Sequence, residues 1–171
     1  MKQDTDRDNS TAEILTPCKK EAFKAFLTAH AQISRELDRR LQACGYISLA
    51  TYDVLVTLEY EEGYRLRMSD LADRVVFSRS GLTRFVDRLV SEGYVEREPC
   101  SDDRRGSFAK LTKKGLAARL EAWKIFEPLL EEFWGELVSE AMATKMADIF
   151  DQISEKARAS ASTKLSNSTN L

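Results

Sequence analysis

Arginines alternate with short hydroxyl side chains in segment 78–91, a pattern suited to contact with nucleic acid. The apolar residues of this segment recur at three- and four-residue intervals, which predicts an amphipathic helix. Short donors let the polar side of such a helix enter a major groove, where arginines can bond base edges or phosphates. The residues expected at this contact are Ser78, Arg79, Ser80, Gly81, Thr83, Arg84 and Arg88.

A second cationic group lies in the polar link between two predicted strands, 94–99 and 107–111. There Asp103 precedes Arg104 and Arg105, and a neighbouring carboxylate can hold an arginine in one rotamer. An arginine presented in this way suits the electronegative minor groove. An exposed charged turn would explain the link by itself. The order of helix, turn, helix and hairpin favours contact with DNA instead.

The elements before segment 78–91 are predicted from periodicity and capping residues. An apolar stripe from Phe23 onward predicts a first helix that ends at Gly45. Ser48 is the expected N-cap of a second helix, and residues 66–67 form a short extended link. Ser69 is expected to cap a third helix, so that two short helices stand side by side in sequence as in a helix-turn-helix unit.

The elements after the third helix are predicted in the same way. A turn at 76–77 leads to the arginine-bearing helix, which should stop at Gly93. Thr112 is the expected cap of a long fifth helix that Pro128 should kink or split, and a sixth helix follows Ser139. The fold class is therefore mainly α with a small β-hairpin wing, a winged helix-turn-helix flanked by N- and C-terminal helices.

The last two helices carry more large apolar side chains than the faces of peripheral helices in a lone domain need. An isologous interface with a second copy would cover them, which predicts a homodimer. Its two reading helices would contact half-sites about one helical turn (~34 Å) apart in a pseudo-palindromic operator. The aromatic members of this set are Trp123, Phe126, Phe133, Trp134 and Phe150.

These elements predict five parts of the chain. We expect a disordered arm at 1–19, an N-terminal dimerisation helix at 20–47, a DNA-binding domain at 48–114, C-terminal dimerisation helices at 115–156 and a flexible tail at 157–171.

The distribution of charge agrees with a basic reading unit on an acidic frame. The net charge is −2, but residues 65–119 hold 13 basic and 8 acidic residues, which leaves 13 basic and 20 acidic residues elsewhere. A basic surface of this size attracts phosphate, although it can also be only a solvated face.

Several other classes of protein are disfavoured. The polar N-terminus lacks the apolar core of a signal peptide, and no run approaches the ~20 apolar residues of a membrane span, so a cytoplasmic location is expected. Three cysteines without a C-x-x-C pair indicate free thiols, with neither a disulfide framework nor a zinc site. One histidine and no nucleophile or phosphate-loop motif argue against an enzyme, and no cofactor or metal is expected.

Ordered motifs along the reading unit carry a family resemblance. The matching segments are Ser69-x-Leu71-Ala72, Ser78-x-x-x-Leu82-Thr83-Arg84, Val86-Asp87-Arg88-Leu89, Glu92-Gly93-Tyr94-Val95-x-Arg97, Asp103-Arg104-Arg105 and Leu111-Thr112-x-x-Gly115. With these segments the chain resembles the MarR-type winged helix-turn-helix transcriptional regulators over about residues 20–155. The resemblance implies that segment 78–91 enters the major groove, that Arg105 reaches the minor groove, and that the outer helices form a homodimer.

The resemblance also implies an effector and, as the commoner outcome, repression. Similar proteins bind small aromatic or phenolic ligands between the dimer helices and the reading unit. The facing stripes of the first two helices then offer Phe26, His30, Tyr52 and Leu55 as lining residues. His30 can equally be a core or interface residue.

Two other functions stay open at this stage. One branch of the family senses peroxide through a cysteine in the first helix, but this chain has Lys24 near that position and Cys18 about two turns earlier. The chain could also be a winged-helix interaction module that does not bind DNA. The arginines at 79, 84, 88, 104 and 105 argue against that alternative.

Overall fold

The computed structural model describes residues 15–75, 79–100 and 106–167, and the side chains of these residues except 79–80 and 161–167. The chain divides into two compact units, residues 1–36 and 37–171. The described part of the first unit is the N-terminal portion of helix α1 (Pro17–Ala43). This helix begins three residues before the predicted start at 20.

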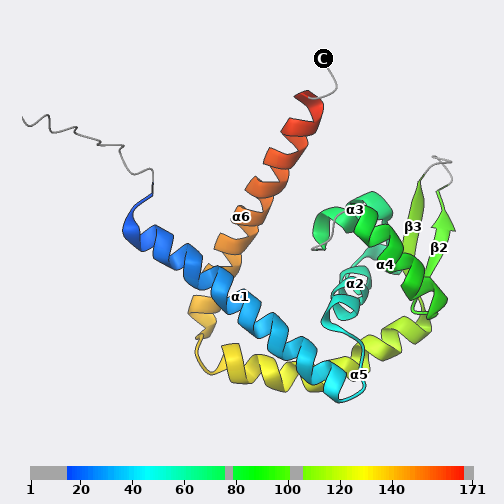
Figure 1. The fold of residues 1–171 in the computed structure, drawn as a ribbon, viewed down its shortest axis with the longest axis horizontal. Coiled ribbons are helices and arrows are strands. Elements are labelled where there is room, and N and C mark those ends of the chain that lie inside the picture. Colours follow the sequence, from blue (N-terminus) through cyan, green and yellow to red (C-terminus); the bar gives the residue numbers. More distant parts are fainter. Residues whose placement is uncertain (1–14, 76–78, 101–105, 168–171) are drawn as a thin grey trace, which may run out of the picture. The chain divides into compact units, whose positions relative to one another are not determined.

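The second unit holds the remaining elements in the order predicted for a winged helix-turn-helix (Figure 1). They are α2 (Leu49–Glu59), the 3-10 turn η1 (Glu62–Tyr64), β1 (Arg65–Arg67), α3 (Met68–Arg74), α4 (Arg79–Ser91), β2 (Val95–Pro99), β3 (Ser107–Leu111), α5 (Lys113–Leu130), the π-helical turn η2 (Glu131–Gly135) and α6 (Glu140–Asn167).

The strands form one antiparallel sheet with the order β1-β3-β2. Strands β2 and β3 confirm the predicted hairpin, whereas β1 is more than the extended link expected at 66–67. It pairs with β3 so that Leu66 lies opposite Ala109, and both side chains are buried. A three-residue strand is too short to show an alternating pattern, and its partner lies some forty residues away along the chain.

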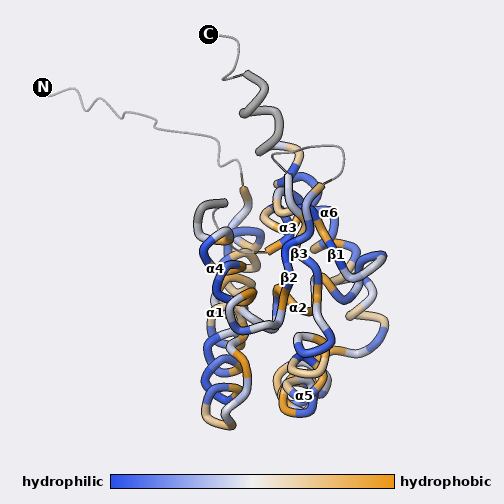
Figure 2. The backbone as a smooth tube through the Cα atoms, turned by 90° about the vertical axis from the view of Figure 1, so that its right-hand side faces the viewer, coloured by the Kyte–Doolittle hydropathy of each residue, from blue (hydrophilic) through white to orange (hydrophobic). Residues whose placement is uncertain are grey.

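Helices α2, α3 and α4 pack with the inner side of the sheet around one hydrophobic core. In Figure 2 α2 is among the hydrophobic segments, while α4 carries hydrophilic stretches. Burial of these aliphatic side chains is the main stabilising contribution. The buried members are Val54, Leu55, Leu58, Leu66, Leu71, Val75, Leu82, Val86, Leu89, Val95, Ala109 and Leu111.

Capping side chains set the start of α2 and of α5. Ser48 Oγ accepts a hydrogen bond from Thr51 N at 3.2 Å, and Thr112 Oγ1 accepts one from Gly115 N at 3.0 Å, so both predicted N-caps are confirmed. The prediction for Ser69 is wrong. Helix α3 begins at Met68 with Arg67 at the N-cap position, two residues earlier, and the Ser69 hydroxyl bonds to the carboxylate of Asp70.

Two glycines end helices as predicted. Gly45 and Gly93 have φ values of +74° and +78°, a left-handed conformation that a Cβ would disfavour. The next amide in each case, Tyr46 N and Tyr94 N, donates to a carbonyl five residues back. This pattern is the Schellman motif, which satisfies carbonyl groups at a helix end.

Gly115 fixes α5 against the base of the wing. A Cβ at this position would overlap the carbonyl oxygen of Tyr94 and stand 2.8 Å from Leu111 Cδ1. The Thr112 hydroxyl adds a hydrogen bond of 2.8 Å to the Gly93 carbonyl. Only glycine allows this close approach, so the start of α5 is tied directly to the turn between α4 and β2.

Helix α5 contains Pro128 and ends earlier than expected, whereas α6 is longer than expected. The regular helix stops at Leu130, two residues after Pro128, and continues as the π-helical turn η2. Helix α6 then extends to Asn167, whereas the sequence predicts a flexible tail from residue 157. Segment 157–167 holds three alanines, a leucine, a lysine and an arginine, which are good helix formers and favour the extension.

Helix α2 also packs on α5 through a second cluster that contains a buried cation. Arg119 is 8 % exposed, and its Nε lies 2.6 Å from Glu59 Oε2. The guanidinium is 5.8 Å from the ring centroid of Tyr52 and 5.4 Å from that of Trp123. Removing one partner of such a pair typically costs about 3–5 kcal/mol, so this contact fixes how α5 lies on α2.

No helix in the described part of the chain is both long enough and apolar enough to span a membrane.

Candidate nucleic-acid interface

Helix α4 is anchored to the core by one face and exposes the other. Leu82, Val86 and Leu89 are completely buried, as the predicted apolar stripe requires. Two of the predicted contact residues, Thr83 and Arg84, lie on the exposed face. Burial of three large side chains fixes the rotation of the helix about its axis, so its hydroxyl and guanidinium groups face outward.

The structure places only part of the predicted DNA contact set. Thr83, Arg84 and Arg88 are exposed on α4, and Gly81 is half-buried in its first turn. Arg79 and Ser80 belong to α4, but their side chains lie outside the description. The remaining predicted contacts, Ser78, Asp103, Arg104 and Arg105, lie outside the described residues, as does the turn at 76–77.

Arg88 is held near the C-terminal end of α4. Its guanidinium carbon lies 4.6 Å from the ring centroid of Phe85, and its Nε lies 3.6 Å from Glu92 Oε1. Both side chains of the ion pair are about half exposed, so the pair orients the guanidinium more than it stabilises the fold.

A bridge between α4 and the wing was not expected from the sequence. Arg97 on β2 donates to Asp87 Oδ1 through Nε at 3.1 Å and Nη2 at 2.8 Å. Its Nη1 donates to Ser107 Oγ on β3 at 3.1 Å. Asp87 and Arg97 both belong to the family-like motifs, but their spacing of ten residues gives no local signal of contact.

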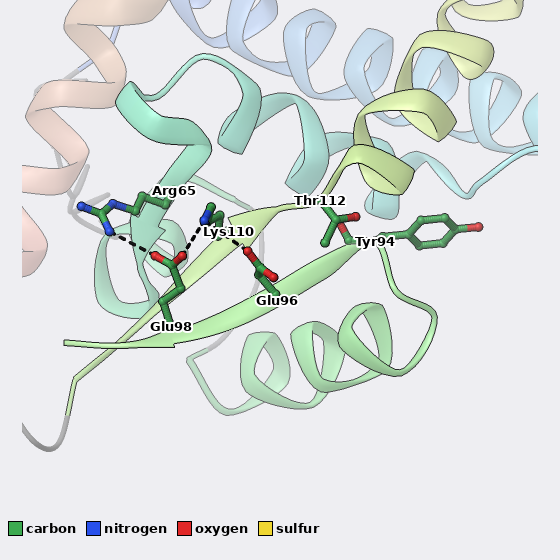
Figure 3. Close-up of polar contacts among 6 residues, drawn as sticks. All are labelled: Arg65, Tyr94, Glu96, Glu98, Lys110 and Thr112. Carbon is green, nitrogen blue, oxygen red and sulfur yellow. Dashed lines mark hydrogen bonds and ion pairs between the residues drawn. The ribbon is translucent and has the colours of Figure 1, made fainter.

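The outer face of the sheet carries a chain of ion pairs across its three strands (Figure 3). Glu98 accepts from Arg65 Nη1 at 3.0 Å and from Lys110 Nζ at 2.5 Å. Lys110 also lies 3.2 Å from Glu96. The hydrogen bonds from Lys110 and Arg65 lower the pKa of Glu98, and the bonds to Glu98 and Glu96 raise the pKa of Lys110.

Arginines from β1 also contact an aromatic ring of the wing. The guanidinium carbons of Arg65 and Arg67 lie 5.0 and 5.5 Å from the ring centroid of Phe108. These contacts attach the short strand β1 to β3 on the outer face, in addition to the backbone pairing. Cation–π contacts of this kind contribute roughly 0.5–1 kcal/mol at exposed sites.

A cleft of about 360 Å³ lies where the start of α3, α4 and the wing meet. Two guanidinium groups and three hydroxyl groups line it, a set of donors suited to the oxygens of a DNA phosphate. The lining residues are Arg67, Met68, Ser69, Thr83, Arg97, Gly106 and Ser107.

The four residues predicted to line an effector site belong to different environments. Phe26 and His30 are exposed on α1, with ring centroids 6.5 Å apart. Leu55 is completely buried in the main core. Tyr52 is buried, stacks on Phe126 at 4.6 Å, and has its pKa raised to about 12, mainly because burial disfavours the phenolate.

The thiols do not form a cluster in the described part of the chain. Cys18 and Cys44 are exposed, and Cys100 is buried. Nothing here tests the thiol-sensing alternative, which stays a prediction. Among the described residues there is also no group of three His, Cys, Asp or Glu side chains that could hold a metal ion.

Comparison with known proteins decides the family. The sequence profile of the MarR family matches residues 47–106. The transcriptional repressor MprA of Escherichia coli K12 is 32 % identical over 133 residues, which cover 76 % of this chain and 72 % of MprA. This chain belongs to the MarR family. The resemblance seen in the sequence is thereby confirmed.

Solved structures support the same assignment. AbsC, a MarR-family transcriptional regulator from Streptomyces coelicolor, is 30 % identical with a TM-score of 0.73, covering 85 % of this chain and 97 % of AbsC. Sco3205 from the same organism, solved in complex with DNA, is 27 % identical with a TM-score of 0.72, covering 83 % and 89 %. The chain is therefore a MarR-family DNA-binding transcriptional regulator with a winged-helix fold, and not an enzyme.

The ion pairs on the outer face of the sheet make stability depend on acid pH. Because the folded-state pKa of Glu98 is lowered, its contribution is present above the usual carboxyl pKa and is lost as pH falls through the folded value. We expect Glu98→Gln to lower the free energy of unfolding at pH 7, and the difference from wild type to shrink at pH 3. Urea unfolding at both pH values measures this. Glu127→Gln on α5 controls for loss of one carboxylate, and an equal deficit for Glu98→Gln at both pH values would contradict the prediction.

Proposed function

We propose that the protein binds a pseudo-palindromic operator as a homodimer and represses transcription until a small aromatic or phenolic effector releases it. In this proposal α4 enters the major groove and the wing, through Arg105, reaches the minor groove. The observation that supports it is the exposed arginine and hydroxyl face of α4, whose opposite face is fixed in the core.

The chemistry of the surroundings favours duplex DNA over a protein partner. Beside α4 lies the cleft with Arg67, Arg97 and three hydroxyl groups, which can take a phosphate. The excess of basic residues is confined to 65–119, while the rest of the chain is acidic. A protein-interaction surface does not need such a concentration of cations.

The dimer is supported by an apolar stripe that this single chain leaves uncovered. Along α6, Met142, Ile149 and Ile153 are each more than half exposed and follow one another at helical intervals. Leu137, just before α6, is 75 % exposed. An exposed aliphatic stripe of this length is typical of an interface, and two copies related by a twofold axis would cover it reciprocally. Trp123 and Phe126, which we also expected at the interface, are half-buried, with Phe126 stacked on Tyr52 and Trp123 beside Arg119.

The effector proposal depends on Phe26 and His30, which α1 exposes one turn apart. Their rings offer an aromatic surface for a small ligand. Tyr52 and Leu55 are buried, so an effector that contacts them must displace part of their packing. A ligand that prefers a conformation unfit for DNA would lower operator affinity by linkage.

Removing the proposed groove contacts should weaken DNA binding in different ways. The ligand is a duplex selected from genomic fragments by the protein itself, and the measurement is fluorescence anisotropy at several salt concentrations. Arg105→Ala should weaken binding severalfold on many sequences. If the guanidinium contacts a phosphate, the slope of the logarithm of affinity against the logarithm of salt concentration should also fall by about 1 in magnitude. Arg84→Ala should relax base preference or, if the guanidinium contacts a phosphate, lower the affinity equally for all sequences.

Lys124→Ala is the control, because Lys124 is a cation of α5 that is paired with Glu121. This variant should change neither the operator affinity nor its salt dependence. Unchanged binding in both arginine variants would remove them from the interface.

Charges on the stripe of α6 should separate the dimer. The double variant Ile149→Glu/Ile153→Glu places two carboxylates at an apolar contact. Sedimentation should then report the monomer mass of 19.4 kDa in place of twice that value, with operator affinity reduced tenfold or more. Ala147→Glu, on another side of the same helix, should leave the dimer intact. A wild-type chain that sediments as a monomer would contradict the proposed assembly.

Aromatic probes should act through the exposed rings of α1. We expect millimolar benzoate or phenol to lower wild-type operator affinity severalfold, and Phe26→Ala to reduce that response. Phe23→Ala, an exposed phenylalanine of the same helix, is the matched control. The measurement is operator binding with and without each probe. Equal responses in the two variants would assign the effector contact elsewhere.

A further inference from the structure

We propose that Asp87 is a positioning residue for DNA recognition, which clamps Arg97 and thereby fixes the wing against α4. The inference deepens the proposed function and rests on it, because it concerns how the two DNA-contacting elements are held in one geometry. Asp87 is not among the DNA contacts proposed above, whereas Arg97 lines the cleft that can take a phosphate.

The contact joins three elements through one guanidinium group. Asp87 on α4 accepts two hydrogen bonds from Arg97 on β2, and Ser107 on β3 accepts the third. All three guanidinium nitrogens are therefore engaged, and their fixed planar geometry transmits the position of α4 to both strands of the wing. A lysine could supply the charge at Arg97 but not this set of directions.

The contact between Asp87, Arg97 and Ser107 lies where it can hold the orientation of the wing. Val95, at the start of β2, is 2 % exposed and belongs to the core, so the base of the wing is held by apolar packing. Arg97 lies two residues farther along β2, and Ser107 opens β3. The bridge thus extends the attachment between α4 and the hairpin toward its tip, where half-exposed side chains replace the apolar core.

Electrostatics alone would disfavour Asp87. Its side chain is 59 % exposed on the face of α4 that also carries Arg84 and Arg88, so it brings a negative charge toward phosphates. If the residue acted only through its charge, removing that charge should strengthen binding to any duplex. If it positions the wing, removal should weaken binding to the operator despite the favourable change in charge.

These opposite signs define the experiment. Full-length Asp87→Asn is compared with wild type by fluorescence anisotropy on the selected operator and on random duplex, over a range of salt concentrations. We expect operator affinity to fall about 5- to 20-fold, random-duplex affinity to stay equal or rise, and the salt slope on random duplex to be unchanged. The fall in the ratio of the two affinities is a readout that general destabilisation of a folded protein would not produce.

Matched variants complete the test. Glu121→Gln removes an exposed carboxylate that pairs with Lys124 on α5, and not with a residue of α4 or the wing, and should not lower the ratio. Arg97→Lys keeps the positive charge but loses the three directed hydrogen bonds of the guanidinium, so it should lower the ratio as Asp87→Asn does. Asp87→Glu keeps the carboxylate and should retain part of the wild-type ratio of operator to random-duplex affinity. Thermal unfolding followed by circular dichroism checks that each variant is folded.

The outcomes separate the inference from the proposed function. Stronger binding of Asp87→Asn to both duplexes by the same factor would overturn the positioning role and assign Arg97 to the phosphates. If wild type binds the operator and Arg84→Ala loses it while Asp87→Asn binds like wild type, the inference alone fails. A wild-type protein that binds no duplex would overturn both.

Discussion

The recognition surface depends on the burial of one face of α4. Leu82, Val86 and Leu89 are inserted completely into the core formed with α2, α3 and the sheet. Because the side chains of a helix point outward at fixed angles, this burial decides which of its residues meet DNA. The apolar contribution is the large one, so the polar groups of the exposed face can be chosen for recognition without loss of the fold.

The wing and the long helix α5 are tied to that core by short, directional contacts. Gly93 ends α4, and the Thr112 hydroxyl bonds back to the carbonyl of Gly93, while Gly115 lets α5 approach Tyr94 closely. Farther along α5, Arg119 is paired with Glu59 and lies near the rings of Tyr52 and Trp123. A movement of α5 relative to α2 would have to break this ion pair, so the pair opposes such a movement.

The sequence predicted most local features because local physical chemistry decides them. The caps at Ser48 and Thr112, the stops at Gly45 and Gly93 and the hairpin strands depend on residues close together in the chain. Ser69 failed as a cap because the position of α3 is set by pairing of the preceding strand with β3, which lies far away in sequence. The buried Arg119 was not foreseen, because its partner Glu59 lies sixty residues earlier in the chain.

The amino-acid sequence by itself determined the family, the order of the elements and the cationic residues offered to DNA, since these follow from periodicity, turn chemistry and residue type. Tertiary structure alone decided which carboxylates pair with the other cations of the sheet: Asp87 with Arg97, and Glu98 with Arg65 and Lys110. The reason is that an ion pair between different elements depends on their relative placement, which only the packing of the whole core fixes.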